Sequence, residues 1–389
     1  MPWKETRIMD ERMRFILAVE EEEKKGSTRF FTRLCASFGI KRATGYKWVE
    51  RFNQGGVAAL ADRARVAASC PHATPPEVID KIVALRKERP HEGPKKLLAL
   101  LREREPELAV PSTSTIGDIL DRNGLVRPRR RRLRVPASSA PLAHALSPND
   151  LWCTDYKGDF RLGDRSQCYP LTITDAFSRY AIKLEALPNT SDELAWPHFE
   201  RAFREFGLPL RMRSDNGPPF ATKTVGGLSK LSIRWIRLGI FPERIDPGHP
   251  EQNGRQERLH LTMKQQVAPQ ATSVEQQRAY DRFLHDYNDV RPHEALGQTP
   301  PARRYEPSWR PMPSKLPTPE YEPELVPRLV NEKGVVSWKG ERLLITRLLA
   351  SQPVGFKPVH DDEWQVFYGP VLLGWVSRRN EKLCLKPLP

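Results

Sequence analysis

The chain has 389 residues, which is too long for one ordinary hydrophobic core and predicts two to four domains. Apolar residues make up 39% of the chain, enough to build packed interiors. Its 63 Lys and Arg residues outnumber 48 Asp and Glu residues, and the formal charge of +15 favours a polyanionic partner such as nucleic acid.

Cysteine usage and hydropathy exclude two further classes of protein. The five cysteines are scattered, and no pair of them has C-x-x-C spacing, so we expect neither a disulfide framework nor a zinc knuckle. The sequence contains no run of about 18 apolar residues and no apolar N-terminal segment. We therefore expect a protein of the cytoplasm with no membrane partner.

Residues 1–66 have the pattern of a helix-turn-helix domain. Helices are predicted over residues 12–23, 30–38 and 42–52, and Gly39 provides the turn between the last two. An ordinary three-helix bundle is the alternative, but basic residues gather on the third helix. The predicted small core consists of Leu34, Cys35, Phe38, Ile40, Tyr46 and Val49. The side chains predicted to face DNA are Arg42, Thr44, Lys47 and Arg51.

A second, similar helical domain is predicted over residues 72–126. Its helices should span residues 76–88, 94–105 and 112–122, the last one opening with Ser/Thr caps after Pro111. An arginine-rich linker follows over residues 127–147. Its arginines cannot pack in a core, so the segment is either a solvated linker or an arm that tracks DNA phosphates. The arm is the interpretation we prefer, with DNA contacts from Arg129, Arg130, Arg131 and Arg132.

The pattern changes to alternating strands and helices over residues 148–306. Strands are predicted at 151–157, 168–175, 180–186, 210–214 and 233–238. Helices are predicted at 192–206, 223–231 and about 250–267. This order indicates an α/β domain with a mixed sheet flanked by helices.

The C-terminal part begins with a proline-rich linker over residues 307–330, which contains seven prolines between 307 and 327. Short strands are then predicted at 334–338, 341–345, 354–358, 363–368, 371–377 and 382–385. Residues 331–389 are therefore expected to form a small β-barrel.

Three acidic residues stand where catalytic carboxylates could converge. Asp155 lies in the first predicted strand, Asp215 closes a later strand, and Glu257 lies on the helix that follows. Carboxylates that converge repel one another and need a neutralising cation, and oxygen ligands select Mg²⁺ or Mn²⁺. Two such ions could activate an attacking oxygen and stabilise a leaving one in phosphoryl transfer.

The motifs around these acids occur in a specific order: TDYKG, TDAFSRY, SDNGPPF, HPEQNGRQERLH and YNDVRPHEALGQTPP. Together they resemble the DDE transposase and retroviral-integrase superfamily, in particular bacterial insertion-sequence transposases with N-terminal helix-turn-helix modules. FGIKRATGYKWVERF and DRARVA near the N-terminus are similar to the same branch. The resemblance implies a ribonuclease-H-like core, two divalent metal ions, and cleavage and joining of DNA. It also implies that Asp155, Asp215 and Glu257 are the catalytic metal ligands.

Glu257 has a rival for the third position. The superfamily often places 35 residues between the second Asp and the Glu, which would select Glu251. The local motif instead places the Glu three residues after the glycine, here Gly254, and this selects Glu257 with 41 residues between. On one helix the two glutamates would be about 240° apart and could not both face the metals. We prefer Glu257 and expect Glu251 to face away.

Other polar residues receive weaker assignments. Lys264 shares a helical face with Glu257 and is either a phosphate contact or a solvated lysine. Asp175 is expected to hydrogen-bond in a turn, and His249, His260 and His293 are taken as structural or close to DNA. Arg291 pairs with an acid or with a phosphate, and the sequence does not decide which.

The function expected from these features is that of a transposase that binds double-stranded DNA at element ends, cuts it and transfers strands to target DNA. We expect a homo-oligomer, because two ends must be joined together, and a bacterial, nucleoid-associated location. The alternatives are a non-catalytic DNA-binding regulator derived from a transposase and a plain ribonuclease-H-like nuclease.

Overall fold

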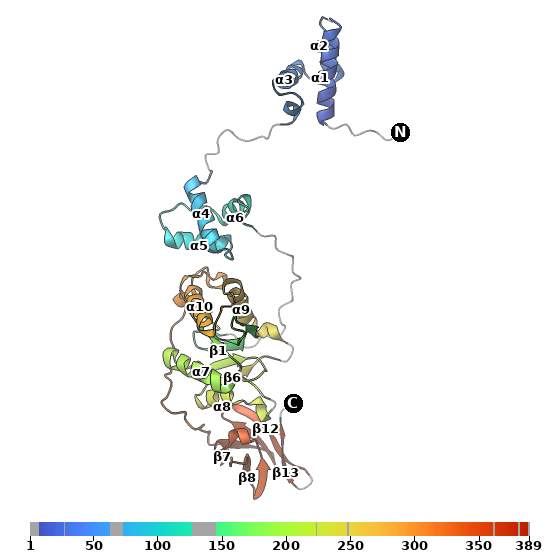
Figure 1. Ribbon diagram of the computed structural model, residues 1–389. Helices are drawn as coiled ribbons and strands as arrows, with labels where there is room; N and C mark the ends of the chain where they lie inside the picture. Colours follow the sequence, from blue (N-terminus) through green and yellow to red (C-terminus); the bar gives the residue numbers. More distant parts are fainter. Residues whose placement is uncertain are drawn as a thin grey trace. The chain divides into compact units, whose positions relative to one another are not determined.

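The computed structural model describes residues 8–26, 28–62, 73–126, 145–222, 224–246, 249–360, 362–379 and 382–387. The chain divides into two compact units, Met1–Ala73 and Thr74–Pro389 (Figure 1). The arginine cluster predicted to contact DNA, Arg129 to Arg132, lies outside the described residues.

The first unit consists of three helices and a short 3₁₀ turn. They are α1 (Ile8–Lys24), α2 (Phe31–Ser37), α3 (Arg42–Gly55) and η1 (Val57–Leu60). Gly39 has a φ of +66° between α2 and α3, so the predicted glycine turn is present. The buried apolar side chains are Phe15, Ile16, Val19, Cys35, Trp48 and Leu60.

Tyr46 does not belong to this core, contrary to the sequence-based prediction. Its side chain is 52% exposed and stacks on Phe31, with ring centroids 4.1 Å apart. The reason is the close packing of α3 at Gly45, where an added Cβ would lie 2.6 Å from the Cys35 sulfur. This contact turns Gly45 and Trp48 inward, and Tyr46 outward.

The second unit begins with three helices that match their predicted ranges to within a residue. They are α4 (Pro76–Glu88), α5 (Pro94–Arg104) and α6 (Thr113–Arg122), and we call them the α4–α6 module. Ser112 caps α6 by accepting a hydrogen bond from the Thr115 backbone N–H. The helices meet around Ile82, Leu97 and Ile116, each fully buried.

The central domain is built on a mixed sheet, as predicted. Its strands are β1 (Leu151–Tyr156), β2 (Phe160–Arg161), β3 (Gln167–Asp175), β4 (Ala181–Leu187), β5 (Arg211–Ser214) and β6 (Phe241–Arg244). Strand β1 pairs antiparallel with β3 and parallel with β5, while β5 pairs parallel with β6. The core therefore changes strand direction at β1.

Helices cover both faces of this sheet (Figure 1). One apolar cluster joins Trp152 and Met212 to α7 (Asp192–Phe206) and α8 (Lys230–Arg237). A second cluster joins the other face to α9 (Gly254–Gln266) and α10 (Ser273–His285). The helix α10 was not predicted from the sequence.

Residues 233–238 were expected to form a strand, and this expectation is wrong: residues 230–237 are the helix α8. Leu231 and Trp235 pack toward the sheet, while Ile233 and Ile236 pack on the C-terminal domain. Apolar residues on two sides of the helix leave only a narrow polar face, formed by Lys230, Arg234 and Arg237, so the segment resembled a strand in the sequence. The strand at this place in the sheet is β6, which follows α8.

The helix expected over about residues 250–267 is also divided. A 3₁₀ segment, η3 (Pro250–Asn253), precedes α9, which begins at Gly254. Glu251 and Glu257 therefore do not lie on one continuous α-helix, and the angle of about 240° between them does not apply. The Glu251 side chain lies outside the described part of the structure.

The C-terminal strands occur near their predicted positions, but the structure has open sheets, so a β-barrel is not confirmed. Five antiparallel strands lie in the order β13-β12-β11-β10-β7, and β8 and β9 form a separate hairpin. Their bounds are β7 (Val326–Leu329), β8 (Val335–Trp338), β9 (Glu341–Leu344), β10 (Pro353–His360), β11 (Glu363–Tyr368), β12 (Val371–Arg379) and β13 (Lys382–Pro387).

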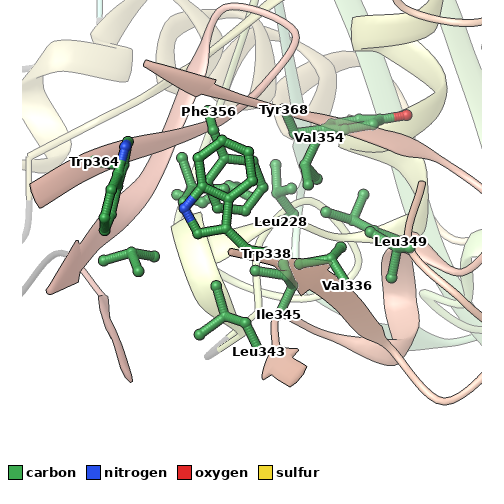
Figure 2. Packing of buried hydrophobic residues seen from close by; sticks show 14 of the residues in the cluster. Leu228, Val336, Trp338, Leu343, Ile345, Leu349, Val354, Phe356, Trp364 and Tyr368 are labelled. Carbon is green, nitrogen blue, oxygen red and sulfur yellow. The ribbon is translucent and has the colours of Figure 1, made fainter. Parts of the chain in front are cut away.

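The hairpin packs over one face of the five-stranded sheet instead of closing it. Trp338 of β8 stacks on Phe356 of β10 with ring centroids 4.1 Å apart (Figure 2). Leu228, which precedes α8, reaches into the same cluster (Figure 2). The C-terminal sheet thus shares its hydrophobic core with the central domain.

None of the helices in the described ranges combines the length and the apolar character needed to cross a membrane.

Candidate active site

The strand register places Asp155 and Asp215 at the same level of the sheet. Cys153 of β1 pairs with Arg213 of β5 in parallel, and each aspartate follows its paired residue by two positions. Side chains two residues apart point to the same face of a strand, so both aspartates lie on one face. This face is opposite to that of the paired Trp152 and Met212, which pack toward α7 and α8.

Helix α9 covers the face that carries the aspartates, and two polar side chains fix it there. The buried Gln256 donates a hydrogen bond to the Cys153 carbonyl at 2.7 Å and accepts one from the Thr174 hydroxyl at 3.1 Å. One turn later, His260 Nε2 lies 2.9 Å from the hydroxyl of Thr172. Apolar packing alone would permit a helix to slide, whereas these directional bonds set its position along β1 and β3.

Thr172 connects the histidine to the first aspartate. It lies directly opposite Asp155 in the antiparallel pairing, and its hydroxyl donates to the Asp155 carbonyl at 2.9 Å. His260 Nδ1 is 3.8 Å from the Asp155 carboxylate. Burial, followed by the charges of Lys157 and Lys264, lowers the pKa of His260 to about 3. The imidazole is therefore neutral at physiological pH.

Negative charge accumulates around Asp155. Burial is the largest cause of a pKa for Asp155 that is raised to about 7, and the charges of Asp215 and Glu257 contribute to the same rise. Burial also raises the pKa of Asp215, against the N–H of Gly217, which lowers it. Asp215 and Glu257 are thus each within electrostatic reach of Asp155, and a cation beside Asp155 would relieve this repulsion.

Glu257 lies in the first turn of α9, next to Gln256, and its side chain is exposed. Lys264, seven residues later, is also exposed, and its charge acts on His260. Among the residues that the structure describes, no group of three or more His, Cys, Asp or Glu side chains is arranged to hold a metal ion. The two aspartates lie on adjacent strands, and Glu257 does not form a metal-ligand group with them in this structure.

Asp175 has the turn role expected of it. Its carboxylate accepts hydrogen bonds from the Ser178 backbone N–H at 2.7 Å and from the Ser178 hydroxyl at 2.6 Å. Its other oxygen accepts from the Asn149 N–H at 2.8 Å. The bonds from Ser178 close the loop after β3, and the bond from Asn149 ties this loop to the segment before β1, so Asp175 supports the fold near the site.

The sequence interpretation missed Gln256, Thr172 and Thr174, and it gave His260 no specific partner. Their signal was present: Gln256 and His260 are four residues apart on a helix whose inner face also carries Leu259 and Met263. Polar residues at apolar helical positions indicate partners on the surface that the helix covers.

The side chains of the first unit that were predicted to face DNA differ in their solvent exposure. Arg42 and Lys47 are exposed on α3, whereas Thr44 and Arg51 are half-buried. The guanidinium of Arg51 lies 5.0 Å from the centre of the Trp48 ring. Arg42 and Lys47 are therefore the more accessible of these candidates.

Replacing Gln256 tests the anchoring of α9. Gln256→Leu removes both hydrogen bonds and leaves the buried Cys153 carbonyl and Thr174 hydroxyl without them. We expect a loss of about 1–3 kcal/mol in the free energy of unfolding, measured by chemical denaturation of the full chain. Gln265→Leu, at an exposed position of the same helix, should change it by less than about 0.5 kcal/mol. Equal effects of the two substitutions would contradict the anchoring role.

Comparison with protein families identifies three matching segments. The integrase core domain matches residues 145–250 and, in a second form, residues 238–301. A homeodomain-like domain matches residues 44–120, which includes most of α3 and reaches α6. The integrase matches contain Asp155, Asp215 and Glu257.

Relatives occur in bacterial insertion elements. An uncharacterized 39.2 kDa protein of insertion element IS476 from Xanthomonas euvesicatoria is 29% identical over 182 residues, 46% of this chain. The chain spans 50% of the length of that relative. A 31.7 kDa protein of insertion element IS407 from Burkholderia multivorans is 28% identical over 228 residues, 57% of this chain and 78% of the relative.

Retroviral proteins are more distantly similar. The Pol polyprotein of feline endogenous virus is 31% identical over 98 residues, 25% of this chain and 9% of the polyprotein. Among solved structures, the simian T-cell lymphotropic virus intasome has 16% identity and a TM-score of 0.35, covering 75% of this chain and 97% of that one. The HTLV-2 integrase catalytic core in complex with magnesium has 15% identity and a TM-score of 0.30, covering 42% and 100%. Scores this low do not by themselves establish a shared fold.

The sequence motifs, the mixed sheet and the two integrase matches agree with one another. The chain therefore combines a homeodomain-like segment with an integrase core domain, and it is similar to proteins of bacterial insertion elements.

Proposed function

We propose that this chain is a transposase that cuts element-end DNA and transfers the freed strand ends to target DNA. The observation that carries the proposal is the position of Asp155 and Asp215 at the same level of two adjacent parallel strands. The charge of Glu257 acts on Asp155. An integrase core surrounds these residues, and insertion-element proteins are among its relatives. The catalytic residues in this proposal are Asp155, Asp215 and Glu257.

The same three carboxylates are the proposed metal ligands. Their hard oxygen atoms fit Mg²⁺ or Mn²⁺. The pKa of Asp155 is raised first by burial and then by the charges of Asp215 and Glu257, and a cation would offset that repulsion. We expect two ions. When bound, such ions make water or a 3′-hydroxyl more nucleophilic and stabilise the leaving oxygen.

The chain's own residues position these groups. Gln256 and His260 hold α9 against β1 and β3, which keeps Glu257, the neighbour of Gln256, within electrostatic reach of Asp155. The neutral His260 adds no charge that would compete with a cation for Asp155. Lys264 is proposed to contact a DNA phosphate beside the carboxylates.

DNA recognition is assigned to the helical parts and the arginine cluster. The proposed contacts on α3 are Arg42, Thr44, Lys47 and Arg51, and the arm between the α4–α6 module and the core would add Arg129 to Arg132. Contacts of this kind with phosphates supply affinity and orientation but little sequence selectivity. The partners are double-stranded DNA at element ends and targets and further copies of this chain, since two ends must be joined.

Asp155→Asn tests the catalytic assignment. The substitution keeps the size of the side chain and removes its charge, so DNA binding should persist while cleavage falls by at least about a hundredfold, equivalent to about 2.7 kcal/mol of barrier. The measurement is Mg²⁺- or Mn²⁺-dependent cleavage of a labelled duplex taken from the sequence that flanks the gene, together with binding to the same duplex.

Asp164→Asn is the matched control, because Asp164 is an exposed aspartate of the same domain whose carboxylate accepts a hydrogen bond from the Ser166 hydroxyl. Wild-type cleavage by Asp155→Asn would remove Asp155 from the catalytic set. Metal-independent binding without any cleavage by the unmodified chain would favour the regulator derived from a transposase.

A second pair of substitutions separates the rival glutamates. Glu257→Gln should lose cleavage about as severely as Asp155→Asn, because the charge of Glu257 acts on Asp155 from the first turn of α9, whereas Glu251→Gln should keep at least about half of it. Cleavage of the same labelled duplex is compared for both variants at equal DNA occupancy. If Glu251→Gln is the inactive variant, the third ligand has been assigned to the wrong residue.

Lys47→Gln tests the assigned DNA face of the first unit. Loss of one phosphate contact should lower the slope of log affinity against log salt concentration by about 0.9 and weaken binding to unrelated duplexes equally. The measurement is a salt titration of DNA binding by the full chain. Lys25→Gln is the control, because Lys25, which directly follows α1, pairs with Glu21 of α1 at 2.9 Å. Equal slopes for Lys47→Gln and the unmodified chain would exclude this contact.

A further inference from the structure

The α4–α6 module contacts the integrase core through a defined surface. On the core side, the contacts come from the segment Asp286–Arg304, which follows α10 and contains the motif YNDVRPHEALGQTPP. Val290 of this segment packs against the apolar cluster of the module. The contact therefore joins two parts that are separated by the arginine-rich segment in the sequence.

A buried ion pair lies at the centre of this surface. Arg291 of the core donates to the carboxylate of Glu92, which lies between α4 and α5. The side chains are 8% and 1% exposed, respectively. Lys96 of α5 approaches the second Glu92 oxygen at 3.4 Å. Arg291 thus pairs with an acid, which decides the alternative that the sequence left open.

More exposed ion pairs surround the central one, and their polarity alternates. The module supplies the cation in Arg89–Asp286 and Lys95–Glu294, each with a shortest separation of 2.6 Å. It supplies the anion in Glu103–Arg303, as in Glu92–Arg291. A surface with alternating signs favours one orientation of the module, because a shift would bring like charges together.

The core presents Arg291 from a rigid support. Residues Asp286–Val290 form a π-helical turn, an uncommon element that is frequent at functional sites. Within this turn, Asn288 bonds to both the N–H and the carbonyl of Ala181 at 2.8 and 2.9 Å. The backbone N–H of Arg291 donates to the Asp286 carbonyl at 2.7 Å. These bonds attach the segment to β4 of the central sheet.

The same support leads to the candidate active site. Tyr287, in the π-helical turn, is buried in one apolar cluster with Leu259 and Met263 of α9. Helix α9 carries Glu257 on its first turn. The module, the Arg291 segment and the catalytic helix therefore form a continuous packed series.

We propose that the Glu92–Arg291 pair locks the α4–α6 module onto the integrase core and thereby sets where bound DNA meets the carboxylates. The proposal rests on the proposed function, because it assigns Arg291 as a positioning residue for DNA cleavage. Glu92 and Arg291 touch each other and not the reacting atoms, so their effect is on placement.

The charges predict an unequal response to removal of either partner. Glu92→Gln leaves two cations, Arg291 and Lys96, side by side in a buried place with no anion between them. Arg291→Gln leaves Glu92 with Lys96 as a remaining partner. Loss of one member of a buried pair is costly because the other charge remains uncompensated, and joint replacement is milder. Glu92→Gln should therefore be the more severe single change.

Hydrogen exchange of the full chain without DNA tests the lock. For Glu92→Gln, we expect backbone amides of α5 and of residues 286–296 to exchange at least about tenfold faster, because loss of the ion pair makes local opening of these segments more favourable. Arg291→Gln should have a smaller effect, and Glu92→Gln with Arg291→Gln should be closer to the unmodified chain than Glu92→Gln alone. Amides of β10–β12 should keep their rates in all variants, which shows that the chain remains folded.

Arg303→Gln is the matched control, because Arg303 and Glu103 form a pair across the same surface but are 60% and 44% exposed. Exposed pairs contribute little, so its exchange rates should equal those of the unmodified chain. The lock is overturned if Glu92→Gln exchanges no faster than this control.

The positioning role needs a second readout, which is cleavage of the labelled duplex in Mg²⁺ or Mn²⁺. Glu92→Gln should reduce cleavage at the normal position about tenfold or more and scatter the remaining cuts, with partial recovery in the double variant. If the module is loosened but rate and position of cleavage are unchanged, the positioning role is wrong. Failure of the proposed function would appear differently, as full activity of Asp155→Asn with the exchange results intact.

Discussion

The candidate site depends most on the two hydrogen bonds of Gln256, a fully buried amide between α9 and the central sheet. A helix that rests on a sheet through apolar contacts alone can be repacked at modest cost in several positions. The amide permits one position, because its two ends need the Cys153 carbonyl and the Thr174 hydroxyl together. The relation of Glu257 to Asp155 follows from this requirement, and so does the burial of His260 against Thr172.

The parts of the fold that could be predicted from the sequence are those whose signals are local. In the α4–α6 module, α4 and α5 begin with a proline, α6 begins after a serine cap, and each helix has one apolar face; all three were predicted to within a residue. Asp155 and Asp215 were found because each stands at a strand end within a specific local motif. The partners of Gln256 and Arg291 could not be predicted, because both lie far away in the sequence and depend on how the elements pack.

The errors have a common physical origin in tertiary packing. Helix α8 resembled a strand because two hydrophobic clusters use its opposite sides. Tyr46 was placed in a core by its size, although close packing at Gly45 turns it outward. The regular spacing of C-terminal strands suggested a barrel, which is not confirmed: the strands pair as a five-stranded open sheet and a separate hairpin of β8 and β9. Strand spacing alone does not distinguish these two arrangements.

The proline-rich segment between the core and the C-terminal strands is attached along its length. Arg310 donates to the carbonyls of Pro209 and Leu238, and the Tyr321 hydroxyl donates to the carbonyl of Pro353. Fixed φ angles at the prolines lower the entropy lost on such docking. The segment therefore helps to hold the C-terminal sheets against the central domain.

The double burial of α8 limits how this protein can be divided. A chain shortened to end before β7 would expose Leu228, Ile233 and Ile236 together, since their neighbours in the cluster come from the C-terminal sheets. An exposed hydrophobic patch of this kind promotes association in water, so an isolated integrase core of this chain would be prone to self-association or aggregation. For this protein, the segment that carries the proposed catalytic residues is shorter than the segment that should remain stable in solution on its own.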